Sequence, residues 1–192
     1  MISPRSGQRL HLACGAHLLA GWVNLDACAR DGVVPLELPH GLAGMADGSA
    51  EYIYCSHFLE HLAYPDEALA LVRHCHRLLV HGGTLRLVVP GIEKIIRAYV
   101  ENNAAFFRIQ ATVHPVTCTT PLEHLMYALQ EGGRHRYGFD LDTLEKLLRG
   151  AGFAAVRRCD FNQSPHEPLR IDYRDLRDDQ GGYLSLFAEA TK

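Results

Sequence analysis

The chain has 192 residues, of which 47% are hydrophobic and 21% charged, a length and composition typical of one globular domain. Its 19 Lys and Arg and 22 Asp and Glu give a net charge of −3 and are scattered along the sequence, which argues against nucleic acid as a partner. The hydrophobic runs stop short of the roughly 20 residues that span a bilayer, and the N-terminus has no apolar segment typical of a signal peptide. We therefore expect a soluble, cytoplasmic domain without membrane contact.

The cysteine and histidine contents bear on redox state and metal binding. The six cysteines form no Cys-x-x-Cys pair, and without a signal segment they are expected to be reduced thiols. Twelve histidines are many for a domain of this size, so a metal site has to be weighed before it is dismissed.

The first half of the chain alternates between two hydrophobic periods. An apolar stripe at helical spacing, from Ala68 to Leu79, ends at the turn His81-Gly82-Gly83. Strand, helix and strand in this order predict a right-handed βαβ unit in a mostly parallel sheet, and therefore an α/β fold. The short apolar runs that predict strands are residues 9–14, 22–26, 52–55 and 84–89.

The second half begins with a helix directly after Pro90-Gly91, whose apolar residues run from Ile92 to Tyr99. Residues 101–134 have no clear period and are expected to be irregular, which makes them a candidate cap over a site. We therefore expect one domain over residues 1–192, with a cap insertion at about residues 92–134.

Two strands and a helix are expected to complete the chain. Asp142 and Glu145 have the spacing of a capping box, which predicts a helix over Leu144–Arg149. Residues 153–160 and 183–189 are expected to be strands, and the absence of a helix between them favours an antiparallel pair.

The first candidate site follows the first predicted strand. Cys14-Gly15 forms a small-residue turn there, and Asp26 ends the next strand, where an acidic side chain can hold ribose hydroxyls. The alternative is a plain tight turn with an Asp that only ends a strand. The Gly15–Gly21 link is shorter than a parallel crossover with a full helix requires, so we expect this first crossover helix to be missing or reduced to about one turn.

The second candidate site is the run Ser56-His-Phe-Leu-Glu-His61 at the end of a predicted strand. With it, the sequence resembles the class I S-adenosylmethionine-dependent methyltransferases, in particular small bacterial ones that carry a Ser-His-x-Leu-Glu-His run. Their Pro-Gly-Gly turn corresponds to His81-Gly82-Gly83, with the proline replaced. The resemblance covers nearly the whole chain, including the segments 21–26, 144–153 and 184–190.

The resemblance implies a fold, a cofactor and site residues. The fold is a Rossmann-like, doubly wound, mostly parallel sheet of seven strands with one antiparallel strand, and the cofactor is S-adenosylmethionine. Two departures from the family's pattern are Ala13, in place of its first glycine, and Glu37, where Asp is commoner. The implied contacts are Ala13, Cys14 and Gly15 with the methionine part, Asp26 with the ribose, Glu37 and Leu38 with the adenine edge, and Cys55, Ser56 and His57 beside the methyl group.

The implied activity is methyl transfer to an unidentified small-molecule or sugar-containing acceptor. Holding the acceptor in line with the methyl group supplies much of the acceleration. His57 is the candidate base for a hydroxyl acceptor, because an imidazole titrates near neutrality; the alternative is a strand-end histidine bonded to the backbone. Glu60 and His61 are expected to stabilise the start of the following helix.

Two other functions compete with this interpretation. His57-x-x-Glu60-His61 matches the zinc signature of inverted zincins, which would make the protein a zinc-dependent hydrolase. That chemistry needs both histidines inside one helix, whereas His57 is expected at a strand end, so we assign no metal ligand. Ala13 and the short first crossover instead raise the alternative of a cofactor-binding protein without turnover.

The cap region contributes the polar cluster Arg134-His135-Arg136-Tyr137. We expect His135, Arg136 and Tyr137 to contact the acceptor, an anionic one in particular; the alternative is an exposed basic turn. Neither the acceptor nor the oligomeric state follows from the sequence, and a homodimer is left open.

Overall fold

The structure is a computed structural model that describes residues 7–192. Its centre is a seven-stranded sheet with the order β3-β2-β1-β4-β5-β7-β6. The antiparallel strand is β7, which pairs with both β5 and β6, whereas the other neighbours are parallel. The expected fold class is thus confirmed. The strands are β1 (Gln8–Leu12), β2 (Val23–Asp26), β3 (Val33–Pro35), β4 (Ala50–Ser56), β5 (Leu79–Pro90), β6 (Ala155–Cys159) and β7 (Ser185–Thr191).

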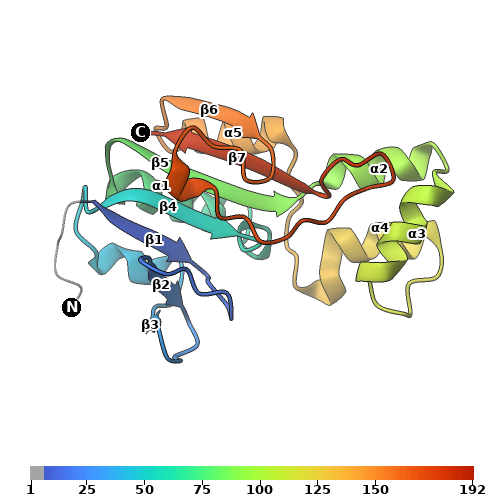
Figure 1. Ribbon diagram of the computed structural model, residues 1–192, viewed down its shortest axis with the longest axis horizontal. Coiled ribbons are helices and arrows are strands. Elements are labelled where there is room, and N and C mark those ends of the chain that lie inside the picture. The colour runs from blue at the N-terminus through green and yellow to red at the C-terminus, as the bar shows by residue number, and fades with distance from the viewer. Residues whose placement is uncertain (1–6) are drawn as a thin grey trace.

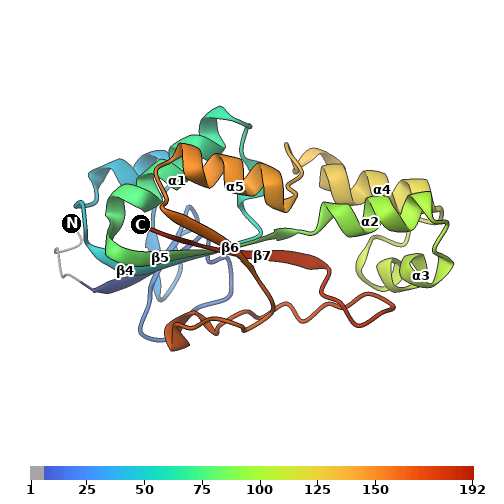
Figure 2. The ribbon, with the colours of Figure 1, turned by 90° about the horizontal axis from the view of Figure 1, so that it is seen from above.

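One face of the sheet is covered by α1 (Asp66–Leu78), α5 (Leu141–Gly150) and the short η1 (His40–Gly44) (Figure 2). Both α-helices bury residues at helical spacing against the sheet, because their apolar side chains recur every three or four positions. The predicted cap of α5 at Asp142 is wrong: Asp140 is the N-cap, and its Oδ1 accepts from the amide of Thr143 at 2.8 Å. This bond to Thr143 also lowers the pKa of the Asp140 carboxyl.

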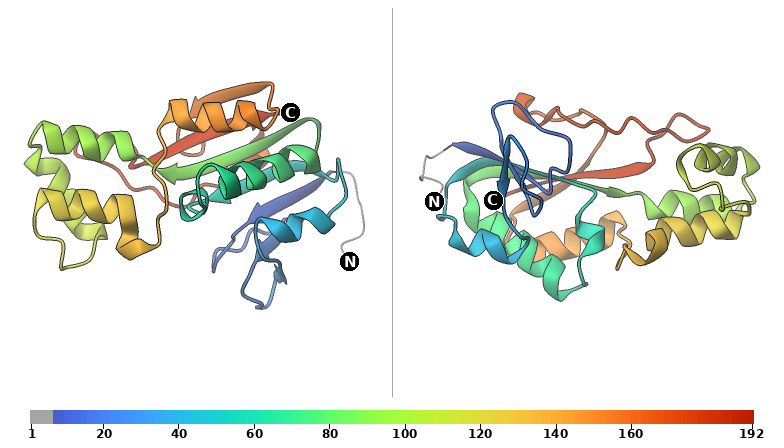
Figure 3. Two further views of the ribbon diagram at one scale, coloured as in Figure 1. Left: turned by 180° about the vertical axis from the view of Figure 1, so that it is seen from behind. Right: turned by 90° about the horizontal axis from the view of Figure 1, so that it is seen from below.

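The other face is covered by the C-terminal segment, residues 160–184, whose only helix is η4 (Glu167–Leu169) (Figure 3). The guanidinium of Arg86, fully buried on β5, fastens this segment to the sheet. It donates to the carbonyl oxygens of Asp160 and Gln163, at 2.9 and 3.2 Å, and to the carboxylate of Asp172.

The first crossover has no helix, as expected. Residues 13–22 join β1 to β2 as a loop. The buried side chain of Asn24 replaces helical hydrogen bonds there: its Oδ1 accepts from the amide of Leu19, and its Nδ2 donates to the Leu19 carbonyl. The helix α1 ends at Leu78 and β5 begins at Leu79, so the Gly82-Gly83 pair lies inside β5 rather than at the end of the helix.

A helical lobe extends beyond the carboxyl end of β5 (Figure 1). It consists of α2 (Ile92–Val100), α3 (Ala104–Val113), α4 (Pro121–Gln130) and η3 (Glu131–Gly133). The expectation of irregular backbone over residues 101–134 is therefore wrong. Asn103 caps α3, and Thr120 forms a full capping box with Glu123 on α4. Among residues 7–192, none of the helices is long and apolar enough to cross a membrane.

Candidate functional site

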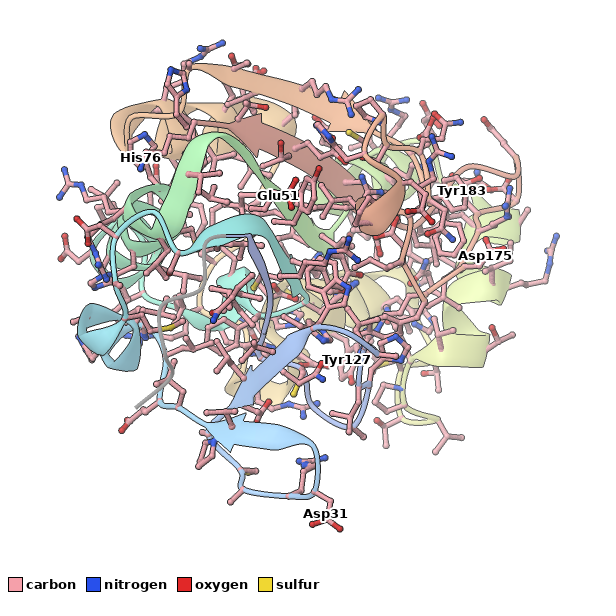
Figure 4. The ribbon with its side chains drawn as sticks, turned by 60° about the vertical axis from the view of Figure 1, so that its left-hand side comes forward. Asp31, Glu51, His76, Tyr127, Asp175 and Tyr183 are labelled. Carbon is pink, nitrogen blue, oxygen red and sulfur yellow. The ribbon has the colours of Figure 1, made fainter. Side chains whose placement is uncertain are left out.

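A cavity of about 330 Å³ lies between the carboxyl ends of the strands and the helical lobe. Parallel strands deliver their following loops to one edge of a sheet, which is where ligands bind in open α/β folds. The C-terminal segment closes one side. Tyr183 of this segment, labelled in Figure 4, packs on Phe161 and Phe187, and Asp178 pairs with Lys94 of α2 at 2.7 Å. Five parts of the chain line this cavity. The stretch after β4 contributes His57, Glu60 and His61, and the end of β5 with α2 contributes Pro90, Gly91, Ile92 and Ile95. The helix α3 and its end contribute Phe106, Gln110, Val113 and His114. The helix α4, η3 and the stretch after η3 contribute Tyr127, Ala128, Glu131, Arg134 and His135, and the C-terminal segment with β7 contributes Arg174, Leu176, Leu184 and Ser185.

The turn after β1 and the end of β2 come together as predicted. Asp26 Oδ2 accepts from the amide of Gly15 at 2.9 Å, and Oδ1 accepts from the amide of Cys28 at 3.0 Å. Ala13 and Gly15 both have a positive φ, near 50°. A Cβ placed on Gly15 would meet no atom within 4 Å, so the backbone there borders open space. Cys14, by contrast, is buried.

The residues predicted for the adenine edge follow β3. The amide of Leu36 donates to the carbonyl of Asp26 at 2.8 Å, which holds this stretch next to the end of β2. Glu37 is exposed and Leu38 is half-buried. Both residues are therefore on the same sheet edge as Asp26.

The two residues that end β4 point to opposite faces of the sheet, as alternation along a strand requires. Cys55 is enclosed in the core, and burial raises the pKa of its thiol well above the ordinary value. The Cys55 thiol therefore packs in the core, and a place for this residue beside a transferable methyl group stays a prediction that concerns its backbone. Ser56 is also buried, on the other face with Tyr54.

His57 reaches the cavity from the junction after β4. Its φ of 52° is unusual for a residue with a side chain and turns the ring out of the strand's alternation. Its Nε2 hydrogen-bonds Ser185 Oγ at 3.1 Å, and its Nδ1 lies 3.4 Å from Glu60 Oε1. The ring thus contacts side chains rather than the backbone. His57 lies outside the short helix η2 (Leu59–His61), so the one-helix geometry of the zincin signature is absent.

Glu60 and His61 do not stabilise the start of α1, because that helix begins only at Asp66. Instead, the Glu60 carboxylate is 1% exposed and lines the cavity. Its Oε1 is 4.0 Å from His135 Nε2. This role of Glu60 has no signal in the sequence, because the run of residues 57–61 precedes a helix and an acidic residue is typical of a helix start.

Of the three residues predicted to contact an acceptor, His135 lines the cavity. Arg136 pairs with Glu67 at 2.8 Å on the surface, and Tyr137 stacks on Tyr64 with ring centroids 4.0 Å apart. The polar cluster is therefore divided between the cavity and the packing around α1.

Several lining residues had no signal in the sequence. Gln110, Tyr127 and Arg174 come from the lobe and the C-terminal segment, far apart along the chain. His114 also lines the cavity and hydrogen-bonds His124 between their Nδ1 atoms at 3.0 Å. Burial, together with His124, lowers the pKa of His114 to about 4, so this ring is neutral at pH 7.

No protein-family model matches the sequence, and no curated protein sequence matches it. Solved structures do. An S-adenosylmethionine-dependent methyltransferase from Archaeoglobus fulgidus superposes with a TM-score of 0.60 and 15% identity over 98% of this chain and 87% of its own. An S-adenosylmethionine-dependent methyltransferase from Thermotoga maritima, described as a possible histamine N-methyltransferase, superposes with a TM-score of 0.52 and 16% identity over 100% of this chain and 84% of its own. A putative methyltransferase of Haloferax volcanii, solved in complex with the methyltransferase activator Trm112, superposes with a TM-score of 0.53 and 11% identity over 100% of this chain and 84% of its own. The chain therefore has the fold of the class I S-adenosylmethionine-dependent methyltransferases.

Proposed function

We propose that this protein transfers the methyl group of S-adenosylmethionine to a small-molecule or sugar-containing acceptor bound in the cavity. The observation that carries the proposal is the pairing of Asp26 with the open Gly15 turn at the same sheet edge as His57. An acidic side chain and a small-residue turn at neighbouring strand ends are what a nucleoside ligand needs. The fold of the whole chain supports the same activity.

The residues present at this edge fit the cofactor. Each oxygen of Asp26 accepts one backbone hydrogen bond and keeps a second lone pair, so the carboxylate can still accept from two ribose hydroxyls. The open space beside Gly15 admits the methionine part close to the backbone, and Ala13 and Cys14 directly precede Gly15 in this turn. Glu37 and Leu38 border the adenine position. When bound, the cofactor supplies a methyl group on a positively charged sulfur.

The chain's contribution to the chemistry is mainly positional. Holding an acceptor oxygen in line with the methyl group is worth about 7–11 kcal/mol of the barrier. His57 Nε2 removes the proton of a hydroxyl acceptor. The hydroxyl of Ser185 already lies within hydrogen-bond distance of this nitrogen, at 3.1 Å, which supports access of an acceptor hydroxyl to it. The carboxylate of Glu60, beside Nδ1, stabilises the imidazolium that this proton transfer forms.

Binding of the demethylated product, S-adenosylhomocysteine, tests the cofactor site. At a concentration one hundred times the dissociation constant, binding stabilises the folded chain by about 2.7 kcal/mol, which raises the thermal midpoint by about 5–10 °C in a chain of this size. Asp26→Asn should weaken binding at least tenfold, because a hydrogen bond to a charged acceptor is lost. The matched control is Asp31→Asn, an exposed position at the tip of the β2–β3 connection (Figure 4). No heat and no thermal shift at millimolar ligand would refute the proposal.

Turnover separates this proposal from cofactor binding alone. Wild-type protein is incubated with cofactor labelled on the methyl group and with fractionated small-molecule extract, and the labelled product is identified by mass spectrometry. The His57→Gln variant should lose at least a hundredfold in rate for a hydroxyl acceptor, since general-base catalysis contributes about 10²–10⁴, while still binding S-adenosylhomocysteine. Tight product binding with no transfer to any fraction would favour a binding protein without turnover.

A further inference from the structure

Three side chains that can bind a metal ion meet in the wall of the cavity. Glu60 and His61 come from η2, and His135 comes from the stretch that follows η3, more than seventy positions later in the chain. One donor atom of each lies within 4.8 Å of the others. The fold, rather than a local sequence motif, therefore brings this set together.

The carboxylate of Glu60 has no adequate partner among the described residues. It is 1% exposed, and neither of its oxygens has a hydrogen bond within residues 7–192. The nearest basic groups are His57 Nδ1 at 3.4 Å and His135 Nε2 at 4.0 Å. A buried carboxylate without hydrogen bonds is costly, and cation coordination is one of the few ways to offset that cost.

Both histidines are oriented as metal ligands usually are. The Nδ1 of His61 is 3.0 Å from the carbonyl oxygen of Arg134, and the Nδ1 of His135 is 3.0 Å from that of Ala128. Because a carbonyl oxygen only accepts, each Nδ1 carries the hydrogen and each Nε2 keeps its lone pair. Metal-binding histidines show this same backbone contact, which fixes the tautomer and the ring.

We infer that Glu60, His61 and His135 bind a divalent transition-metal ion. Two imidazoles and one carboxylate suit Zn²⁺, Mn²⁺, Fe²⁺ or Co²⁺, whereas Mg²⁺ and Ca²⁺ prefer oxygen ligands. Ligands bonded at about 2.1 Å around a tetrahedral ion lie about 3.4 Å apart. Donor atoms that lie within 4.8 Å of one another therefore need to close by at most about 1.4 Å. Glu131, whose Oε2 is 3.3 Å from His135 Nε2, is the nearest additional carboxylate.

Three protein ligands leave coordination positions open on the cavity side. In a role that rests on the proposed methyl transfer, the ion binds the acceptor oxygen there and lowers the pKa of its hydroxyl, close to His57. The substrate class this favours is an acceptor with a hydroxyl that can coordinate a metal, such as a vicinal diol.

The test is direct metal binding to tag-free, EDTA-dialysed protein. Titration with Co²⁺, followed by visible absorption, and with Zn²⁺, followed by calorimetry, should give one equivalent bound. The variants Glu60→Gln and His135→Gln should each weaken binding at least tenfold, whereas the control His74→Gln, a half-buried histidine on α1, should bind as wild type does. Circular dichroism checks folding, and His135→Gln carries the test if Glu60→Gln does not fold.

Two outcomes would overturn the inference: less than a tenth of an equivalent bound, or unchanged binding in both ligand variants. S-adenosylhomocysteine binding is measured on the same samples and should survive Glu60→Gln and His135→Gln. Cofactor binding without metal binding refutes the metal site alone. Metal binding without cofactor binding refutes the proposed function and leaves the metal site standing.

Discussion

The substitution Arg86→Met removes the group that fastens the C-terminal segment to the sheet. The Arg86 side chain is fully buried on β5 and donates Nε to Asp172 Oδ1 at 3.0 Å and Nη1 to Glu189 Oε1 at 2.9 Å. Its other bonds reach the carbonyl oxygens of Asp160 and Gln163. Methionine fills similar space but offers none of these donors, so the change isolates the charge and its hydrogen bonds.

The expected cost is about 3–5 kcal/mol, the range for removing one partner of a buried ion pair. Both carboxylate side chains left behind are only 2% exposed. Part of the cost is offset, since Glu189 keeps its pair with Arg157 and Asp172 Oδ2 still accepts from the amide of Asn162 at 2.7 Å. For a chain of this length, such a loss lowers the thermal midpoint by about 6–20 °C.

Urea unfolding followed by circular dichroism measures this loss. The control Arg158→Met removes an exposed arginine on β6 that lies 3.8 Å from Glu93, and it should cost less than about 0.5 kcal/mol. The double variant Arg86→Met with Asp172→Asn should recover part of the loss, because one buried charge is gone. An Arg86→Met protein within 1 kcal/mol of wild type would refute the assignment of Arg86 as the fastening group.

Two further predictions concern a cavity wall and a buried histidine. Gly91→Ala should destabilise the chain by about 1–3 kcal/mol, because the new Cβ would lie 2.6 Å from the carbonyl oxygen of Leu184. In the control Gly150→Ala the new Cβ meets nothing within 4 Å, so this variant should be neutral or stabilising. Urea unfolding measures both variants. Burial lowers the pKa of His11, whose ring is hydrogen-bonded to Asn24, to about 4. Between pH 6.5 and pH 4 only the unfolded chain therefore binds a proton at this residue. The free energy of unfolding should fall by up to about 1.4 kcal/mol for each unit by which the pH decreases across that window. His11→Gln should flatten this decline in urea midpoints measured from pH 7 to pH 4, and an unchanged decline would contradict it.

The sheet could be predicted from the sequence because its determinants are local. Short apolar runs bounded by turns predicted the long strands, and the helical spacing from Ala68 to Leu79 predicted α1, although Leu79 is already the first residue of β5. The three-residue edge strand β3 was missed, since so short a run shows no alternation. The helices α3 and α4 were missed although Asn103 and the Thr120–Glu123 capping box signalled their starts; these caps stand among polar residues and prolines that are typical of loops.

The candidate site was predictable only where it follows the strands. Gly15, Asp26 and His57 could be placed together because parallel strands send their following residues to one edge of the sheet. The residues of the lobe and the C-terminal segment that line the cavity with His57 could not be predicted, because hydrophobic periodicity does not show how a lobe packs on a sheet edge. His135 was predicted at the site, but its partners Glu60 and His61 emerged only from three-dimensional packing.

The C-terminal segment links the stability of the sheet to the shape of the cavity. It packs against the short first crossover, where Tyr173 stacks on His17 with ring centroids 3.9 Å apart, and its neighbouring residues Arg174 and Leu176 line the cavity. The absent crossover helix leaves room for this segment, and Arg86 holds it there. Loosening that attachment should therefore affect both parts of the site. It reaches the cavity through Arg174 and Leu176, and it reaches the crossover that carries Gly15 through Tyr173.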